Sequence, residues 1–288
     1  MDTEFVSDLS FLKHLKYKQL VHSLLKRRGY IMKAVILAAG RGQRLYPYTK
    51  YIPKCLLEIG GETILEHQIN HIRDCGIDEI VIVVGFGFEK VENFLRNYDG
   101  LGMKIKTLYN PFYQTTNSLI SLWIARGEMD SDMVVMNGDD VFEIDVLEQA
   151  LRMRDEKICL PVKRKTNYED EDMKVIIQES KIVDISKTLT SRASAESVGV
   201  RVFRDTGVEL LKRSIEEEMR TGGAENKWYI SAIHRLIKKG YKVKSLDIND
   251  LFWMDVDYPS DLFKARLNSD KFIKKSYQER VLRVVETS

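Results

Sequence analysis

A glycine-rich turn flanked by positive charges stands near the start of the chain, at residues 38–54 (AAGRGQRLYPYTKYIPK). Gly40 and Gly42 expose backbone N–H groups, and successive N–H donors form a concavity that binds anions. Arg44 and Lys54 add positive charge on either side of the turn. These residue types predict a phosphate-binding loop, although an ordinary solvated basic turn would also contain them.

Two common phosphate-binding motifs do not explain this turn. A dinucleotide-binding turn reads G-x-G-x-x-G and leads directly into a helix. Here Leu45 stands where the third glycine would be, and Pro47 and Pro53 keep the following segment irregular. The sequence also contains no Gly-Lys-Ser/Thr signature of a P-loop. The glycines alone therefore do not identify the ligand.

Two acidic segments follow predicted strands: NGDD (137–140) follows the fourth strand and WMDVD (253–257) follows the last. Ligands of such sheets bind at the carboxyl ends of strands, so we expect these carboxylates and the glycine turn in one crevice. Carboxylate oxygens together with substrate phosphates suit Mg²⁺. Because Gly-Asp-Asp is also good turn chemistry, a plain turn is the alternative for Asp139 and Asp140.

Apolar runs and helical periodicities alternate along the chain from Met32 onward. Apolar runs typical of strands lie at 33–39, 79–86, 104–110, 132–137, 157–163 and 241–248. Helical patterns lie at 63–75, 88–97, 118–129, 143–154, 206–220 and 228–239, and after Pro259. Between 173 and 204, polar and apolar residues alternate with period two, which predicts antiparallel strands within or beside the sheet. The pattern predicts an α/β fold with a mostly parallel, doubly wound sheet.

Composition and charge restrict the class of protein. The 288 residues carry 45 basic and 43 acidic side chains, a net charge of +2, without the basic excess typical of nucleic-acid binding. No apolar stretch reaches the roughly 18 residues of a membrane-spanning helix, and no signal-peptide pattern opens the sequence. The three cysteines follow no metal-ligand spacing and suit a reduced compartment. We therefore expect a cytoplasmic protein without nucleic-acid partners, and the sequence leaves a homodimer open.

Residues 1–31 differ from the rest of the chain. Apolar residues recur there at helical spacing between Lys and Arg, which predicts an amphipathic extension. Such a helix could lie on an acidic membrane surface. Packing on the main domain, or an upstream start codon, is the simpler interpretation and the one we favour. The chain then divides into this extension, a main domain at 32–267 and a C-terminal tail at 268–288.

His67 and His71 lie four residues apart on a predicted helix, which is the spacing of a zinc-binding pair. Gln68 stands where a metalloprotease would need glutamate, and the sequence offers no evident third ligand. We therefore expect these histidines to lie on a polar helix face.

The first motif resembles that of the nucleotidylyltransferases that make sugar nucleotides and CDP-alcohols. Their pattern, L-A-A-G-x-G-x-R-L-x-P-x-T-x-x-x-P-K, is matched by Leu37-Ala38-Ala39-Gly40, Gly42, Arg44-Leu45, Pro47, Thr49 and Pro53-Lys54. The likeness covers about residues 33–266. It implies that 32–267 is a nucleotidyltransferase catalytic domain, with a Rossmann-like mixed sheet of glycosyltransferase-A type and helices on both faces. It also implies a Mg²⁺-assisted attack of a substrate phosphate on the α-phosphate of a nucleotide, releasing pyrophosphate.

The same resemblance implies roles for individual residues. Arg44 would stabilise charge at the reacting phosphates, Lys54 would contact both substrates, and Asp139 would be the first metal ligand. The second metal ligand would be Asp255 or Asp257, because the family's W-x-D motif favours the former and its choline-type members place an acid two residues later. The remaining implied contacts are with the nucleotide, by Leu37, Ala38, Ala39, Gly40 and Gly42, and with the acceptor's phosphate, by Lys187.

Residues 109–123 (YNPFYQTTNSLISLW) resemble the cytidylyltransferase branch that uses phosphorylated alcohols. Sugar-type members usually have a glycine-rich segment there. The likeness makes Asn110, Thr116, Asn117 and Ser118 candidate contacts to the base or ribose of CTP. Thr116 or Asn117 could also cap the helix that follows, and the two roles are compatible.

Segments 171–175, 195–199 and 225–229 fall where that branch shapes its acceptor pocket. For inositol 1-phosphate, the acceptor we favour, the hydroxyl partners would be Glu196, Asp172 and Asn226. For phosphocholine, the second choice, an aromatic cage would comprise Trp228, Tyr229, Trp253 and Tyr113. The alternative for these aromatic residues is an ordinary place in the core.

The sequence thus predicts a Mg²⁺-dependent cytidylyltransferase that converts CTP and a phosphorylated alcohol into a CDP-alcohol and pyrophosphate. One alternative is a sugar-1-phosphate uridylyl- or thymidylyltransferase. Others are a catalytically silent regulator that binds nucleotides or sugar phosphates, and a membrane adaptor that uses residues 1–31. Retention of the acidic pair together with Arg44 and Lys54 argues against the silent regulator, because a sensor needs no metal ligands.

Overall fold

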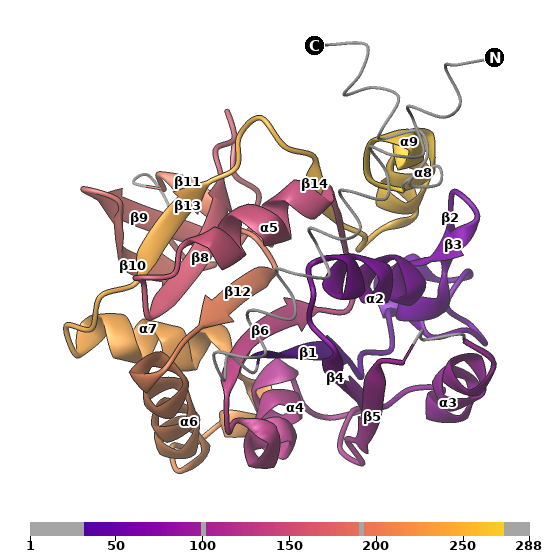
Figure 1. Ribbon diagram of the computed structural model, residues 1–288, viewed down its shortest axis with the longest axis horizontal. Coiled ribbons are helices and arrows are strands. Elements are labelled where there is room, and N and C mark those ends of the chain that lie inside the picture. The colour runs from indigo at the N-terminus through magenta and orange to yellow at the C-terminus, as the bar shows by residue number, and fades with distance from the viewer. Residues whose placement is uncertain (1–31, 99–101, 190–192, 274–288) are drawn as a thin grey trace, which may run out of the picture.

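The computed structural model describes residues 32–98, 102–189 and 193–273. Its centre is a ten-stranded sheet with the strand order β11-β9-β10-β13-β8-β12-β6-β1-β4-β5 (Figure 1). In chain order these strands are β1 (Met32–Ala38), β4 (Glu79–Val84), β5 (Lys104–Tyr109), β6 (Asp132–Asn137), β8 (Ile158–Lys163), β9 (Lys174–Gln178), β10 (Lys181–Ser186), β11 (Ala195–Ser197), β12 (Val200–Phe203) and β13 (Lys244–Asp247).

The first half of the sheet is parallel. β1 pairs in parallel with β4 and with β6, and β4 pairs in parallel with β5. The chain therefore builds outward from β1 to β5 and then returns to place β6 on the other side of β1. This reversal of strand order creates a crevice at the carboxyl ends of β1 and β6, which is where open α/β sheets bind ligands.

The second half of the sheet is mixed. β12 lies between β6 and β8 and is antiparallel to both, whereas β13 is parallel to β8. β9, β10 and β11 form antiparallel pairs at the far edge. The antiparallel strands expected from the period-two pattern at 173–204 are confirmed. The expectation of a mostly parallel sheet holds only for the first half, because β12 reverses direction inside the sheet.

Helices cover both faces of the sheet, as expected. α2 (Ile64–Asp74), α3 (Phe88–Asn97) and α5 (Ile144–Arg152) pack on one face, and α4 (Ser118–Ile124), α6 (Thr206–Met219) and α7 (Ile230–Lys238) pack on the other. Alternate residues of β1 separate the two cores: Ala34 and Ile36 belong to the first, and Val35 belongs to the second. This period-two burial on both faces explains why the strand is apolar throughout.

A short ribbon beside the main sheet carries the second acidic segment. β7 (Asp140–Phe142) pairs with β14 (Trp253–Asp255), and Asp255 lies opposite Asp140. The expectation that WMDVD ends the last strand of the main sheet is therefore wrong, since that strand is β13 and ends at Asp247. The ribbon returns the chain to the crevice and brings the two acidic segments into register.

The last described residues pack against the domain. α8 (Pro259–Leu267) is followed by α9 (Ser269–Phe272), and Phe272 is buried in a cluster with Leu45, Ile64 and Val141. The predicted N-terminal extension, and the tail beyond residue 273, lie outside the described residues.

The two histidines of α2 are buried rather than on a polar face. The rings of His67 and His71 lie 4.1 Å apart, and both pack edge-on against Phe142. The expected polar face is therefore wrong. His67 and His71 lie instead in the apolar contact between α2 and the β7–β14 ribbon.

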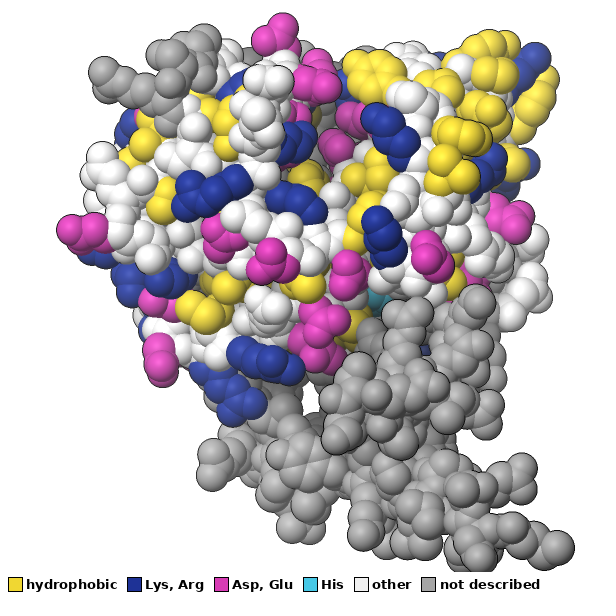
Figure 2. Space-filling view, turned by 90° about the horizontal axis from the view of Figure 1, so that it is seen from above, with side chains coloured by type: hydrophobic (Ala, Val, Ile, Leu, Met, Phe, Trp, Pro, Cys, Tyr) yellow, Lys and Arg dark blue, Asp and Glu magenta, His cyan; other side chains and the backbone are white. Residues whose placement is uncertain are grey.

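Charges of both signs are interspersed over the face seen in Figure 2. Within residues 32–98, 102–189 and 193–273, no helix is long and apolar enough to cross a membrane.

One close approach at the start of α6 offers a test of the packing. A Cβ atom at Gly207 would lie 2.2 Å from the carbonyl oxygen of Lys157, which is a backbone atom and cannot rotate away. We expect Gly207→Ala to lower the free energy of unfolding by about 1–3 kcal/mol, as overpacked sites do. Gly222→Ala is the control, because a Cβ there meets nothing within 4 Å. Urea unfolding of both variants measures the difference, and equal stability would contradict this packing.

Candidate active site

A pocket of about 270 Å³ lies in the crevice at the carboxyl ends of β1 and β6. Most of the predicted site residues line it, whereas Gly42 and two of the suggested hydroxyl partners, Asp172 and Asn226, do not. Those that line it include Leu37, Ala38, Ala39, Gly40, Arg44, Lys54, Asn110, Thr116, Asn117, Ser118, Asp139, Lys187, Glu196, Trp228, Asp255 and Asp257. The structure therefore gathers residues from the first 54 and the last 36 positions of the chain in one place.

Gly42 shapes the loop without lining the pocket. It adopts φ +60°, and a Cβ there would lie 3.0 Å from the Thr49 methyl group and 3.2 Å from the Lys54 Cβ. The Thr49 hydroxyl donates to the Gly42 carbonyl at 2.7 Å. Glycine is required at this position because the left-handed backbone and the close neighbours both disfavour a side chain.

Lys54 links the two acidic segments. Its Nζ lies 2.7 Å from Asp139 Oδ2 and 2.5 Å from Asp257 Oδ1, and only 11% of its side chain is exposed. Burial by itself would lower the pKa of Lys54, but Asp139 and Asp257 outweigh it and the pKa is raised. Lys54 is therefore a fixed positive charge at the floor of the pocket.

Arg44 extends this arrangement toward the mouth of the pocket. Its Nη2 lies 2.5 Å from Asp257 Oδ2, and its Nη1 lies 3.0 Å from Glu171 Oε2. Asp257 thus receives both Lys54 and Arg44. Burial would raise the pKa of Asp257, but these two cations hold it below its ordinary value.

Asp255 has a different environment from Asp257. It opens onto the pocket, and no hydrogen bond or ion pair to its carboxylate occurs within the described part of the chain. Burial, followed by the negative charges of Asp139 and Asp257, raises the pKa of Asp255 to about 6. Asp255 therefore differs from Asp257: neighbouring carboxylates raise its pKa, whereas Lys54 and Arg44 lower the pKa of Asp257.

Asp140, which the sequence placed in the crevice as part of NGDD, with a plain turn as the alternative, is fully buried in the pocket wall. Trp253 Nε1 donates to its Oδ2 at 2.9 Å, and Gly199 approaches so closely that a Cβ there would lie 1.9 Å from the same oxygen. Burial, and then the charges of Asp139 and Asp255, raises the pKa of Asp140 well above its ordinary value. In the sequence, the only signals were the Asp doublet and the tryptophan of WMDVD.

The residues suggested for base and ribose contacts also organise their own segment. The Asn110 side chain accepts a hydrogen bond from Phe112 N at 2.9 Å and donates to Ser121 Oγ at 3.1 Å. Thr116 Oγ1 donates to the Phe112 carbonyl at 2.8 Å. These bonds close the turn after β5 and hold the segment against the pocket.

The predicted side-chain cap of α4 is not formed. Asn117 occupies the N-cap position, but its Nδ2 donates to the Asn226 carbonyl at 2.8 Å instead. Ser118 Oγ accepts a hydrogen bond from Tyr229 N at 3.1 Å. The start of α4 is therefore tied to segment 225–229, and this contact positions Trp228.

Three of the acceptor-binding candidates, Lys187, Glu196 and Trp228, line the pocket together. Lys187 Nζ lies 4.4 Å from the centre of the Trp228 ring and 2.8 Å from Glu171 Oε2. Glu196 is 4% exposed and forms an ion pair with Lys165. Burial raises the pKa of Glu196 to about 8 although Lys165 opposes the shift.

Two of the four aromatic residues suggested as a cage belong to the core. Tyr229 is buried and accepts a hydrogen bond from Arg201, while Trp253 is buried and donates to Asp140. Trp228 is 45% exposed. The core interpretation is therefore correct for Tyr229 and Trp253.

Sequence reasoning missed Arg201, and it named Glu171 only as the start of segment 171–175; both line the pocket. Arg201 is buried in β12, where its Nη2 donates to Ser197 Oγ at 3.2 Å. An arginine inside the apolar run VGVRVF was a signal for a buried polar network. For Glu171 the only signal was its place in segment 171–175, where it stands among other charged residues.

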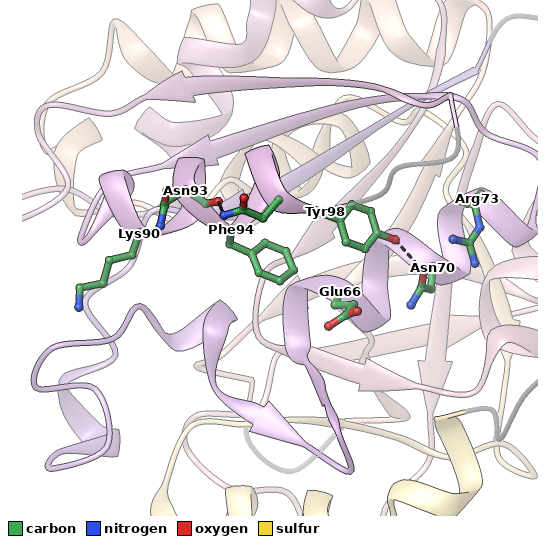
Figure 3. A pocket seen from close by; sticks show the side chains of 8 residues that line it. Glu66, Asn70, Arg73, Lys90, Asn93, Phe94 and Tyr98 are labelled. Carbon is green, nitrogen blue, oxygen red and sulfur yellow. Dashed lines mark hydrogen bonds between the residues drawn. The ribbon is translucent and has the colours of Figure 1, made fainter.

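A second hollow of about 550 Å³ lies between α2 and α3 (Figure 3). Its polar lining includes Glu66, Asn70 and Arg73, and the Tyr98 hydroxyl donates to Asn70 Oδ1 at 2.7 Å. None of the predicted site residues lines this hollow. The pocket at β1 and β6 is therefore the candidate active site.

The Trp253–Asp140 hydrogen bond makes a prediction about stability. We expect Trp253→Phe to lower the free energy of unfolding by about 1–3 kcal/mol beyond the effect of the lost ring volume, because a buried carboxylate loses its donor. Trp123→Phe is the matched control, since its indole donates to the partly exposed Glu216 at 3.1 Å. Urea unfolding measures both variants. Equal losses would mean that the buried bond contributes no more than the exposed one.

Comparison with known proteins identifies the family. Residues 34–206 match the model of the MobA-like NTP transferase domain. The bifunctional IPC transferase and DIPP synthase of Aquifex aeolicus is 30% identical over 236 residues, which are 81% of this chain and 50% of that protein. The CTP:phosphoglutamine cytidylyltransferase of Campylobacter jejuni is 26% identical over 255 residues, which are 80% of this chain and 98% of that protein. The chain spans about half the length of the curated relatives that it matches at about 30% identity.

Solved structures share the fold. The inositol-1-phosphate CTP transferase from T. maritima superposes with a TM-score of 0.69 at 20% identity, covering 89% of this chain and 97% of that one. This likeness confirms the glycosyltransferase-A type of mixed sheet implied by the first motif. Because the family model covers more than half of its residues, the chain belongs to the nucleotidyltransferases with a MobA-like NTP transferase domain.

Proposed function

We propose that the protein is a Mg²⁺-dependent cytidylyltransferase that joins CTP to a phosphorylated alcohol, with inositol 1-phosphate as the first choice of acceptor and phosphocholine as the second. The observation that carries this proposal is the row of alternating charges Asp139–Lys54–Asp257–Arg44 along the pocket. Such a row suits a reaction between two phosphate groups, which needs fixed cations beside anionic ligands.

The proposed reaction is a substitution at phosphorus. An oxygen of the acceptor's phosphate forms a bond to the α-phosphorus of CTP, the bond from that phosphorus to the bridging oxygen breaks, and pyrophosphate leaves with the electron pair. The attacking oxygen is already an anion, so the reaction needs no general base, and positioning with charge neutralisation supplies most of the catalysis. Arg44 and Lys54 provide that fixed charge, and Leu37, Ala38, Ala39 and Gly40 provide the nucleotide's wall.

The donor set fits a magnesium site that the substrates complete. Within the described ranges, no group of three or more His, Cys, Asp or Glu side chains is arranged to hold a metal ion. Mg²⁺ commonly binds one or two carboxylates together with substrate phosphates and water. We assign Asp139 and Asp255 as its ligands, because Asp255 is a carboxylate among carboxylates whereas Asp257 is already held by two cations. When bound, Mg²⁺ would neutralise charge on the phosphates.

The choice of CTP rests on the segment after β5, where the sequence resembles phospho-alcohol cytidylyltransferases. A relative that is 26% identical over most of its length is named a CTP:phosphoglutamine cytidylyltransferase. The preference for inositol 1-phosphate is supported by a structural relative named inositol-1-phosphate CTP transferase and by the buried Glu196 at the acceptor end. The main alternative is a sugar-1-phosphate uridylyl- or thymidylyltransferase.

A pyrophosphate-release assay with Mg²⁺ tests the substrates. CTP, UTP, dTTP, GTP and ATP are each paired with inositol 1-phosphate, phosphocholine and glucose 1-phosphate. We expect turnover with CTP and one alcohol phosphate, and a CDP-alcohol of the corresponding mass. Turnover confined to UTP or dTTP with glucose 1-phosphate would overturn the interpretation of residues 109–123 and favour the sugar alternative.

The metal assignment is tested by comparing Asp255→Asn with Asp257→Asn. We expect Asp255→Asn to raise the Mg²⁺ concentration needed for half-maximal activity by about tenfold or more, because it removes a ligand. Asp257→Asn should mainly raise the KM for the substrates, because Arg44 and Lys54 lose the carboxylate between them. Mg²⁺ titration of the initial rate measures both variants, with urea unfolding to confirm that each is folded. The reverse pattern would exchange the two roles.

A further inference from the structure

Glu171 occupies an unexplained position at the mouth of the pocket. It lies in the loop between β8 and β9, and one of its oxygens, Oε2, contacts two cations from different parts of the chain. Arg44 Nη1 is 3.0 Å away and Lys187 Nζ is 2.8 Å away. A single oxygen between two cations at these distances has the environment that a phosphate oxygen would need.

This contact completes a row of ion pairs across the pocket. The order is Lys187–Glu171–Arg44–Asp257–Lys54–Asp139, and all six residues line the pocket. Asp257 is enclosed by its two cations, with a side chain 19% exposed. Glu171 is 51% exposed, so its carboxylate is the member of the row that can leave most easily.

The backbone beside Glu171 is anchored although its side chain is exposed. The Asp172 carboxylate accepts hydrogen bonds from Lys165 Nζ and from Glu169 N, both at 2.9 Å. Rotation of the Glu171 side chain alone is therefore enough to release Arg44 and Lys187, without any rearrangement of the sheet.

Lys187 would keep a second contact after such a release. Its Nζ lies 4.4 Å from the centre of the exposed Trp228 ring. A cation over an aromatic face is held there by the ring's quadrupole. Lys187 would therefore stay near its place and offer its charge to another anion.

We propose that Glu171 competes with the acceptor's phosphate for Arg44 and Lys187, so that the acceptor's phosphate takes its place only by displacing this carboxylate. A carboxylate carries one negative charge, whereas a phosphomonoester carries up to two near neutral pH. A doubly charged phosphate is attracted to the two cations more strongly than a carboxylate is and can therefore displace Glu171, but the competition lowers its apparent affinity. The acceptor's part in this proposal rests on the function proposed above, while the competition between anions does not.

The test is the binding of small phosphate esters, measured by isothermal titration calorimetry without turnover. The second pKa of a phosphate monoester is about 6, so methyl phosphate is a dianion well above that pH. Dimethyl phosphate, a diester, remains a monoanion. We expect Glu171→Gln to bind both esters more tightly than the wild type does. The two affinities should rise by a similar factor, because both esters have to displace the same carboxylate in the wild type.

The expected size follows from two partly exposed ion pairs, which together correspond to a change of about three- to tenfold. Glu169→Gln is the matched control. It removes the same charge from the same loop, where the Glu169 side chain is exposed, and it should leave both affinities unchanged. In a Lys187→Gln background, the effect of Glu171→Gln should shrink, because one of the two cations released is missing.

Steady-state kinetics then separates this proposal from the proposed function. With the acceptor identified by pyrophosphate release, Glu171→Gln should lower its KM by a similar factor. Unchanged or weaker binding of methyl phosphate in Glu171→Gln, or an equal effect of Glu169→Gln, would overturn the competition. Tighter binding of both esters in a protein that turns over no acceptor would support the competition and count against the proposed reaction.

Discussion

The ion pairs of Lys54 with Asp139 and Asp257 are the interaction on which the rest of the site depends. They join three segments: the loop after β1, the turn after β6, and the residues that follow β14. A lysine that is almost fully buried would lose its charge if it stood alone, because burial favours the neutral form. Its two carboxylates keep it charged. The same contact therefore holds the crevice together and places a permanent cation at its floor.

This arrangement gives four neighbouring aspartates different properties. Asp257 is neutralised by cations, and its pKa is lowered for that reason. Asp140 is buried with an indole donor, and Asp255 faces other carboxylates, so their pKa values are raised. Residue type alone does not distinguish these roles, since all four are the same amino acid within two short segments. The protein environment decides which carboxylate is structural and which is available to a cation.

The two ends of the pocket are coupled through hydrogen bonds of the backbone as well as through charge. The N-terminus of α4 is bound to segment 225–229 through Asn117, Ser118 and the backbone of residue 119. The segment suggested for CTP and the segment that carries Trp228 therefore form one hydrogen-bonded wall. Substitutions that alter the choice of nucleotide are for this reason expected to affect the choice of acceptor, and the reverse.

The sequence by itself determined the elements, the family and most of the lining of the pocket. Apolar runs and helical periods are local properties, and the motif from Leu37 to Lys54 is contiguous, so both can be read without the fold. The tertiary structure decided what depends on partners distant in sequence. The β7–β14 ribbon placed Asp255 opposite Asp140 and moved WMDVD from the main sheet, where it was expected, to the ribbon. Packing against Phe142 of the same ribbon buried the histidines of α2. The fold also decided that Asn117 bonds to residue 226 rather than capping its helix, and that Glu171 stands between Arg44 and Lys187. The physical reason is that the protonation and burial of a side chain depend on its neighbours in space. Neighbours that are distant in sequence cannot be read from a local stretch of the chain.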